Sequence, residues 1–515
     1  MITVQLSEAN FEYDIHSLVK AFYDKEDVKV FADTEKIKEL EQERTPLFHM
    51  EVSYIYAGSN EDATPAQEKE QSQESTDKIH FEIWKIEAGE KKQQAQAEVL
   101  VDFSNRKETK NKLKQTLYQM LVKYTKKKLP WGTLTGIRPT KIPMAMLEEG
   151  KTEAEIHQYM KETYYASEEK TSLSIDIAKR ELELLKKIDY EKGYSLYIGI
   201  PFCPSICLYC SFSSSPIGIW KNQADAYLDA LEKEIDFTAE ACKDRVLNTI
   251  YIGGGTPTTL TAQQLDRLLT KVEESFDFSG LLEYTVEAGR PDSITEEKLA
   301  VLRKHDISRI SINPQTMKQE TLDFIGRHHT VQQTIESFQL ARKLGFDNIN
   351  MDLIVGLPEE QLSDVKNTME KIKELDPDNL TVHSLAIKRA ARLRMFRDEH
   401  ADMHIYNSWE TIDLTAQYAK TMGMEPYYLY RQKNMAGNFE NVGYAKPGKA
   451  GIYNILIMEE KQSIMALGAG ASTKYVFDHG KRIERVENVK DIKNYLERID
   501  EMIERKRESF ALYMK

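Results

Sequence analysis

Three cysteines crowded into one short segment are the residues of this sequence best suited to chemistry. They lie within eight residues of one another: Cys203, Cys207 and Cys210. Iron–sulfur clusters take thiolate ligands, and a four-iron cluster held by three cysteines keeps one iron open to an outside ligand. A structural zinc ion would need a fourth protein ligand, and the segment from Ile198 to Lys221 contains no His, Asp or Glu. The C-x3-C-x2-C spacing therefore predicts an iron–sulfur cluster.

A glycine-rich segment and several polar residues lie at the ends of other apolar runs. Gly253–Pro257 reads GGGTP, and consecutive glycines let a backbone approach a ligand closely and offer its N–H groups. Glu287, Gln315 and Asp352 recur towards the C-terminal ends of the next three runs. Glu287 and Asp352 could simply form ion pairs, and the glycine run could simply make a turn. An isolated buried carboxylate is costly, however, so their joint placement favours a site for a polar ligand.

Six short apolar runs alternate with segments of helical periodicity and set the expected fold. The runs are 196–200, 249–252, 284–287, 309–312, 349–355 and 380–385. The helical segments are 225–241, 262–276, 295–305, 331–344 and 363–375. This alternation predicts right-handed βαβ units and a parallel sheet, with chemistry at the C-terminal ends of its strands. Six strands are too few for a closed eight-stranded barrel, so an α/β fold with an open, partial (β/α)6 barrel is expected.

The segments that flank this barrel have a different pattern. Residues 1–190 predict an α+β domain, with strands at 48–58, 78–86 and 98–103 and a long amphipathic helix at 109–127. The polar run at 60–77 predicts a mobile loop. The barrel core is expected over 191–394, followed by a mixed α/β region over 395–515 that ends in a charged helix at 489–508.

Composition excludes several classes of protein. The 515 residues carry a formal net charge of −13, which argues against general affinity for nucleic acid or for an anionic membrane surface. No run approaches the roughly 20 apolar residues of a membrane span, and the first residues lack the pattern of a signal peptide. Only four cysteines occur, too few for a disulfide scaffold. We expect a cytoplasmic protein.

The cysteine spacing after a strand of a βα repeat resembles the radical S-adenosylmethionine (SAM) superfamily. Within it, residues 190–480 resemble the oxygen-independent coproporphyrinogen III oxidases (dehydrogenases) of haem biosynthesis and their relatives. The stretches that carry this resemblance are YIGIPFCPSICLYCSF, YIGGGTPTTL, YTVEAGRPDSI, RISINPQT, IGRHH, INMDLIVGLPEE and ALGAGAS. Residues 1–190, 129–141 and 427–444 are similar to a longer branch of the family, HemZ.

This resemblance implies two cofactors and a set of residues that hold them. A 4Fe–4S cluster would be bound by the three cysteines, and SAM would occupy its open iron through the amino and carboxylate groups. The implied SAM contacts are Tyr197, Tyr209, Gly254, Gly255, Thr256, Glu287, Gln315, Arg327, Asp352, Ala386 and, with a weaker match, Ser472. A one-electron donor such as flavodoxin or ferredoxin is implied as a partner.

The implied reaction is the oxidative decarboxylation of coproporphyrinogen III to protoporphyrinogen IX, but two positions depart from the pattern. Phe212 stands where the dehydrogenases have a further cysteine, and Tyr453 stands where haem-chaperone relatives have a histidine. A haem chaperone, or a radical SAM methyltransferase or ring-opening enzyme acting on a tetrapyrrole, therefore stays open as an alternative. Candidate partners for the carboxylates of such a ligand are Arg389, Arg392 and Arg394, whose alternative role is a solvated basic helix face.

Overall fold

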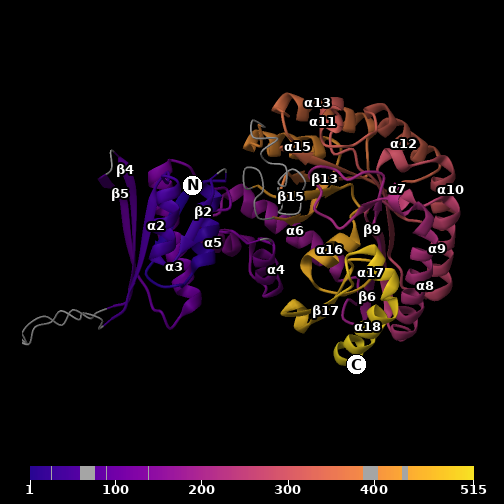
Figure 1. Cartoon of the computed structure of the whole chain (residues 1–515), viewed down its shortest axis with the longest axis horizontal. Coiled ribbons are helices and arrows are strands. Elements are labelled where there is room, and N and C mark those ends of the chain that lie inside the picture. The colour runs from indigo at the N-terminus through magenta and orange to yellow at the C-terminus, as the bar shows by residue number, and fades with distance from the viewer. Residues whose placement is uncertain are drawn as a thin grey trace, which may run out of the picture. The chain divides into compact units, whose positions relative to one another are not determined.

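The computed structural model describes residues 1–24, 26–57, 76–87, 90–136, 138–386, 404–431 and 439–514. The chain forms two compact units, Met1–Ile175 and Asp176–Lys515 (Figure 1). The segment 60–77, where a mobile loop is expected, lies outside the described residues apart from positions 76 and 77. No helix in the described ranges is long and apolar enough to cross a membrane.

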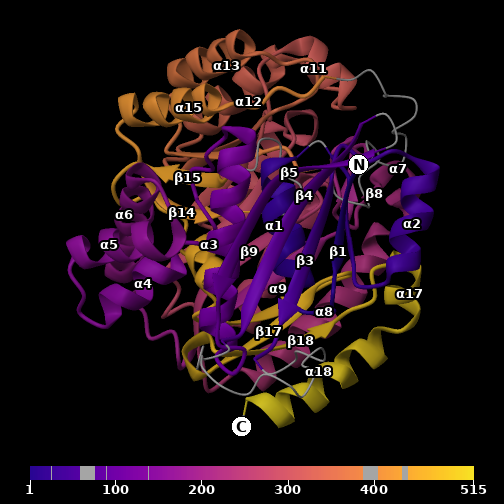
Figure 2. The same cartoon turned by 90° about the vertical axis from the view of Figure 1, so that its left-hand side faces the viewer.

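The N-terminal unit is built on a five-stranded sheet with the order β2-β1-β3-β4-β5 (Figure 2). Its elements are β1 (Ile2–Leu6), α1 (Glu12–Phe22), β2 (Val28–Phe31), α2 (Thr34–Glu43), β3 (His49–Ile55), β4 (Lys78–Glu87), β5 (Glu90–Leu100), α3 (Arg106–Thr125), α4 (Lys141–Glu148), α5 (Glu153–Tyr164) and α6 (Glu168–Leu185). Strands β3, β4 and β5 pair antiparallel, whereas β1 pairs parallel with β2 and β3. Helix α6 spans the division between the two units, so that division falls before the predicted boundary at residue 190.

The core of the second unit confirms the predicted open, parallel arrangement. Six strands lie in the order β13-β12-β11-β10-β9-β6, all parallel: β6 (Gly193–Ile200), β9 (Val246–Gly254), β10 (Glu283–Gly289), β11 (Arg309–Ile312), β12 (Ile349–Val355) and β13 (Asn379–Ser384). These strands are buried along nearly their whole length. Both faces of such a sheet are covered, so its strands appear in the sequence as continuous apolar runs.

The predicted connecting helices lie along the outer side of this sheet (Figure 1). They are α8 (Ala224–Ala241), α9 (Ala262–Ser275), α10 (Glu296–Lys304), α12 (Val331–Lys343) and α13 (Leu362–Leu375), with the short α7 (Ile217–Trp220) and α11 (Gln319–Phe324). Helices α9 and α12 begin at capping boxes, in which Thr261 pairs with Gln264 and Thr330 with Gln333. Such boxes satisfy main-chain donors at the helix start and so fix where each helix begins.

Strands from the C-terminal part of the chain extend the parallel sheet at both edges. Strand β16 (Ser463–Leu467) pairs parallel with β6 and is followed outward by β17 (Ser472–Phe477) and β18 (Arg482–Glu487). At the other edge, β15 (Asn441–Ala445) and β14 (Glu425–Tyr430) pair antiparallel beyond β13. The remaining helices are α15 (Trp409–Thr421), α16 (Ile452–Glu459), α17 (Ile492–Glu497) and α18 (Ile499–Tyr513). The charged helix expected at 489–508 is thus two helices, broken at Arg498.

Candidate functional site

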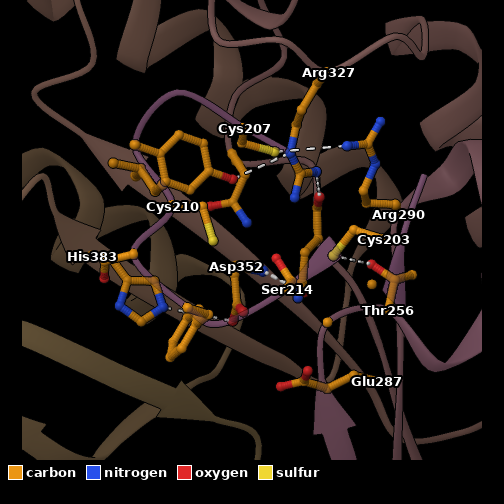
Figure 3. Close-up of a pocket in the computed structure, with 18 of the residues that line it drawn as sticks. Cys203, Cys207, Cys210, Ser214, Thr256, Glu287, Arg290, Arg327, Asp352 and His383 are labelled. Carbon is orange, nitrogen blue, oxygen red and sulfur yellow. Dashed lines mark hydrogen bonds and ion pairs between the residues drawn. The ribbon is translucent and has the colours of Figure 1, made fainter. Parts of the chain in front are cut away.

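A cavity of about 250 Å³ lies at the C-terminal ends of the parallel strands and contains most of the predicted site residues. The lining includes all three crowded cysteines together with Tyr209, Gly254, Gly255, Thr256, Glu287, Gln315, Arg327, Asp352 and Ala386. Figure 3 shows the cysteine sulfurs, the two carboxylates and Arg327 around the same space. Residues far apart in the sequence therefore meet at the edge where parallel α/β folds carry their chemistry.

The cysteine-bearing loop is held in place by the segment that follows α11. The main-chain N–H of Leu208 donates to the carbonyl oxygen of Ile325 at 3.0 Å, and the Ser205 hydroxyl donates to the carbonyl of Gly326 at 2.9 Å. Cys203 itself lies on β7 (Phe202–Cys203), which pairs with β8 (Ser215–Pro216). These two bonds and the pairing of β7 with β8 therefore fix the positions of the thiols.

Donors surround the sulfur atoms. The hydroxyl of Thr256 donates to Cys203 Sγ at 3.6 Å, and Arg290 Nη1 donates to Cys207 Sγ at 3.7 Å. Burial raises the pKa of Cys203 and that of Cys210, while nearby arginine guanidinium groups act in the opposite direction. Ligation by a metal deprotonates such thiols and would overcome the cost of burial.

The donor set of the cysteine loop fits the predicted cluster. All three thiols line one cavity. In a multi-iron cluster each thiolate binds a different iron, so three cysteines hold a four-iron cluster and leave one iron open.

The glycine-rich segment supports the cysteine loop, which differs from the expectation that its N–H groups are free. Gly255 N–H donates to the carbonyl of Ile200 at 2.8 Å, and Thr256 N–H donates to that of Phe202 at 2.6 Å. A Cβ on Gly255 would stand 2.4 Å from the Phe202 carbonyl oxygen. The close contact between these two backbone segments therefore already requires glycine at this position, whether or not a ligand binds there.

Gln315 presents an unsatisfied acceptor to the cavity. The backbone of Gln315 has a φ of 68° and pairs with strand β12. Its N–H donates to the main-chain oxygen of Asp352, and its carbonyl accepts from the N–H of Ile354, each at 2.9 Å. The side-chain Oε1 is buried without a hydrogen-bond partner. A buried acceptor without a donor is costly, so a ligand that donates a hydrogen bond, such as a ribose hydroxyl, fits this position.

The two carboxylates of the cavity have different surroundings. Burial raises the pKa of Glu287 to about 7, although the Tyr251 hydroxyl donates to its Oε1. Asp352 Oδ1 accepts a hydrogen bond from the Asn350 amide at 2.8 Å and lies 4.0 Å from His383 Nε2. Both carboxylates are therefore oriented from outside the cavity and can face a cationic ligand.

Arg327 is a buried residue of the site. It is 5% exposed, and its guanidinium donates to the Tyr209 hydroxyl at 3.3 Å and to the main-chain oxygen of Asn313. The pKa of Tyr209 is raised by burial. Arg327 is thereby held beside the cysteine loop, where its guanidinium can pair with a carboxylate of a ligand.

Two predicted residues do not line the cavity. Tyr197 stacks against Tyr251 with ring centroids 6.3 Å apart, and Ser472 lies on β17 with its hydroxyl buried and without a hydrogen-bond partner. Arg389, Arg392 and Arg394 lie outside the described residues.

Sequence reasoning missed several residues that do line the cavity. They are Arg290, Asn313, Tyr430, Asn441 and His383. The sequence offers a signal for Asn313, which directly follows the apolar run 309–312, and for His383, which lies within the run 380–385.

Comparisons with known proteins agree with this geometry. The model of the radical SAM superfamily matches residues 197–372. The chain is 42% identical over 404 residues to the oxygen-independent coproporphyrinogen-III oxidase-like protein HemZ of Bacillus subtilis, covering 78% of this chain and 81% of that protein. It is 35% identical to the heme chaperone HemW of Lactococcus lactis, covering 55% and 70%.

A solved structure is similar in fold. Coproporphyrinogen III oxidase HemN from Escherichia coli superimposes with a TM-score of 0.50 at 24% identity, over 62% of this chain and 73% of that one. The chain therefore belongs to the radical SAM superfamily and, within it, to the family of the oxygen-independent coproporphyrinogen III oxidases and their HemZ and HemW relatives.

Proposed function

We propose that the chain binds a 4Fe–4S cluster through Cys203, Cys207 and Cys210 and SAM in the adjoining cavity, and oxidatively decarboxylates coproporphyrinogen III. The supporting observation is the convergence, in one cavity, of three thiols with the polar ends of three successive strands. When bound, the cluster and SAM supply a 5′-deoxyadenosyl radical that can remove a hydrogen atom from a propionate side chain.

The chain's own residues have binding and orienting roles in this proposal. Glu287 and Asp352 are placed to face the positive charge and the ribose of SAM, and the free Gln315 Oε1 is an acceptor for a hydroxyl. Arg327 can pair with the carboxylate of the methionine moiety. The burial of these groups keeps water from a reactive intermediate.

Arg327→Ala and Asp352→Asn are expected to weaken SAM binding while iron content stays unchanged, since neither residue is a proposed ligand. Each removes a charged contact in a buried site, a loss of about 2 kcal/mol or some 30-fold in affinity. Equilibrium dialysis of SAM against the reconstituted variants measures this loss. Arg267→Ala, a half-exposed arginine paired with Asp229 and Glu232, is the control. Unchanged affinity in both test variants would contradict the assignment.

SAM affinity is also expected to fall below about pH 7. The raised pKa of Glu287 means that its carboxyl is protonated, and neutral, at lower pH, so that it loses its attraction for a sulfonium or ammonium group. The charged and polar groups that face it include Tyr251, Asp352, Arg309, the Gly254 N–H, Tyr197 and Tyr453. The expected loss approaches tenfold for each pH unit below the pKa. Binding measured from pH 5.5 to 8.5 should show this slope in the wild type and a flatter profile in Glu287→Gln.

The reaction itself is tested with anaerobically reconstituted protein, SAM, a low-potential reductant and coproporphyrinogen III, with products read by mass spectrometry. We expect slow, SAM-dependent loss of carbon dioxide. Phe212 lines the cavity and is 73% exposed, so Phe212→Cys should be tolerated and should raise the rate if the missing cysteine acts chemically.

Haem delivery is the second candidate, favoured by the similarity to the heme chaperone HemW. Stoichiometric haem binding and transfer to an apo-haemoprotein, without any vinyl product from protein with a full cluster, would replace the first proposal by this one.

A further inference from the structure

Arg290, which follows directly after β10, contacts a cysteine of the loop. It is 3% exposed, and its Nη1 donates to Cys207 Sγ at 3.7 Å (Figure 3). The same nitrogen donates to the Ser205 hydroxyl at 2.8 Å and to the Ser205 carbonyl at 3.1 Å. Its remaining nitrogens form a bidentate pair with Asp292, at 3.0 and 2.6 Å. All three guanidinium nitrogens of Arg290 therefore form hydrogen bonds, and these bonds fix the side chain in position.

The charges around Cys207 do not cancel. Arg327 also interacts electrostatically with Cys207, so two guanidinium charges act on one thiol, while Asp292 supplies the carboxylate paired with Arg290. His329 is buried close to these three groups, and burial followed by the charge of Arg327 lowers its pKa to about 4. It is therefore neutral near pH 7 and adds no charge. Around Cys207 itself, the two guanidinium groups and the Asp292 carboxylate therefore leave a net positive charge.

We propose that the Arg290–Asp292 pair sets the reduction potential of the cluster, with Arg290 as a positioning residue that acts through Cys207. The proposal rests on the cluster proposed above. Hydrogen bonds to ligand sulfurs and nearby charge are main determinants of the potential of iron–sulfur clusters. Reduction adds one electron from an external donor to the cluster, and a buried positive charge stabilises the reduced form more than the oxidised form. Asp292 partly offsets that charge.

Variants of the two members of the pair are expected to shift the potential in opposite directions. Arg290→Gln keeps an amide donor but removes the charge, and should lower the equilibrium constant for reduction about tenfold, which is 59 mV towards negative potential. Asp292→Asn removes the offsetting anion and should raise the potential. Arg290→Lys keeps the charge and should shift the potential less than Arg290→Gln. The measurement is an anaerobic potentiometric titration of the reconstituted proteins, followed by the electron-paramagnetic-resonance signal of the reduced cluster.

Iron and sulfide content, measured on the same samples, separates the two proposals. A wild-type protein that holds no cluster would contradict the proposed cluster. Full clusters with unchanged potentials in Arg290→Gln and Asp292→Asn would overturn the present inference alone. Shifts of the potential in the same direction in both variants would also overturn the inference. Removing a positive charge and removing a negative charge should shift the potential in opposite directions, whereas a disturbed loop should shift it in the same direction in both variants. If Arg290→Gln fails to hold a cluster, the reduction potentials of Asp292→Asn and Arg290→Lys still test the inference.

Discussion

Replacing any one of Cys203, Cys207 or Cys210 with alanine is expected to abolish SAM cleavage, whereas Cys242→Ala retains it. Each of the three loop cysteines would bind a different iron, so no neighbouring thiol can replace a lost one. Cys242 lies at the end of α8, is 2% exposed, and has its pKa raised to about 12 by burial. A thiol in that setting behaves as a small apolar side chain.

The measurement is the iron content of anaerobically reconstituted protein together with the 5′-deoxyadenosine formed from SAM and a reductant. Wild type and Cys242→Ala should hold about four irons and form this product, as expected for a 4Fe–4S cluster. Loss of the cluster in Cys242→Ala, with an active Cys203→Ala variant, would reverse the ligand assignment.

The second large effect concerns stability and arises from a buried ion pair outside the cavity. Lys506 Nζ lies 2.7 Å from Glu234 Oε1, and both side chains are almost fully buried. The same carboxylate accepts hydrogen bonds from Asn488 at 2.7 Å, from the Tyr495 hydroxyl at 2.6 Å and from the Gly468 N–H at 2.8 Å. It thus ties α8 to the C-terminal helices and to the turn after β16.

Lys506→Met is expected to cost about 3–5 kcal/mol of unfolding free energy, because it leaves the Glu234 carboxylate buried without its cation. Arg507→Met is the matched control on the same helix. It removes an exposed pair with Glu504 and should cost about 0–1 kcal/mol.

The double variant Glu234→Leu with Lys506→Met should regain part of the loss, since it removes both charges. Urea unfolding followed by circular dichroism compares the midpoints. Equal midpoints for Lys506→Met and Arg507→Met would contradict the expected cost.

The sequence predicted the six parallel strands because burial on both faces leaves a continuous apolar run, as in Ile349–Val355. Strands β1 and β2, of five and four residues, were not predicted. The break between α17 and α18 at Arg498 also escaped, because no Gly or Pro marks it. The break between the helices results from tertiary packing, and the local sequence pattern contains no information about such packing.

Position on a strand predicted part of the cavity lining. Glu287 and Asp352 line the cavity, whereas Tyr197 on β6 and Ser472 on β17 do not. Arg290 was missed because its contact is with Cys207, 83 positions earlier in the chain. His383 was also missed, since its neighbours Asp352 and Tyr430 come from other strands.

The pairing of β6 with β16 has a consequence for how the protein is made. Residues 193–200 emerge from the ribosome long before their partner at 463–467, a delay on the order of tens of seconds at ordinary rates of translation. During that interval the strand that leads into the cysteine loop has an open edge, which is prone to pairing with other chains. Iron is thus best delivered after synthesis is complete, and slow translation, which lengthens this interval, is expected to increase the demand for chaperones.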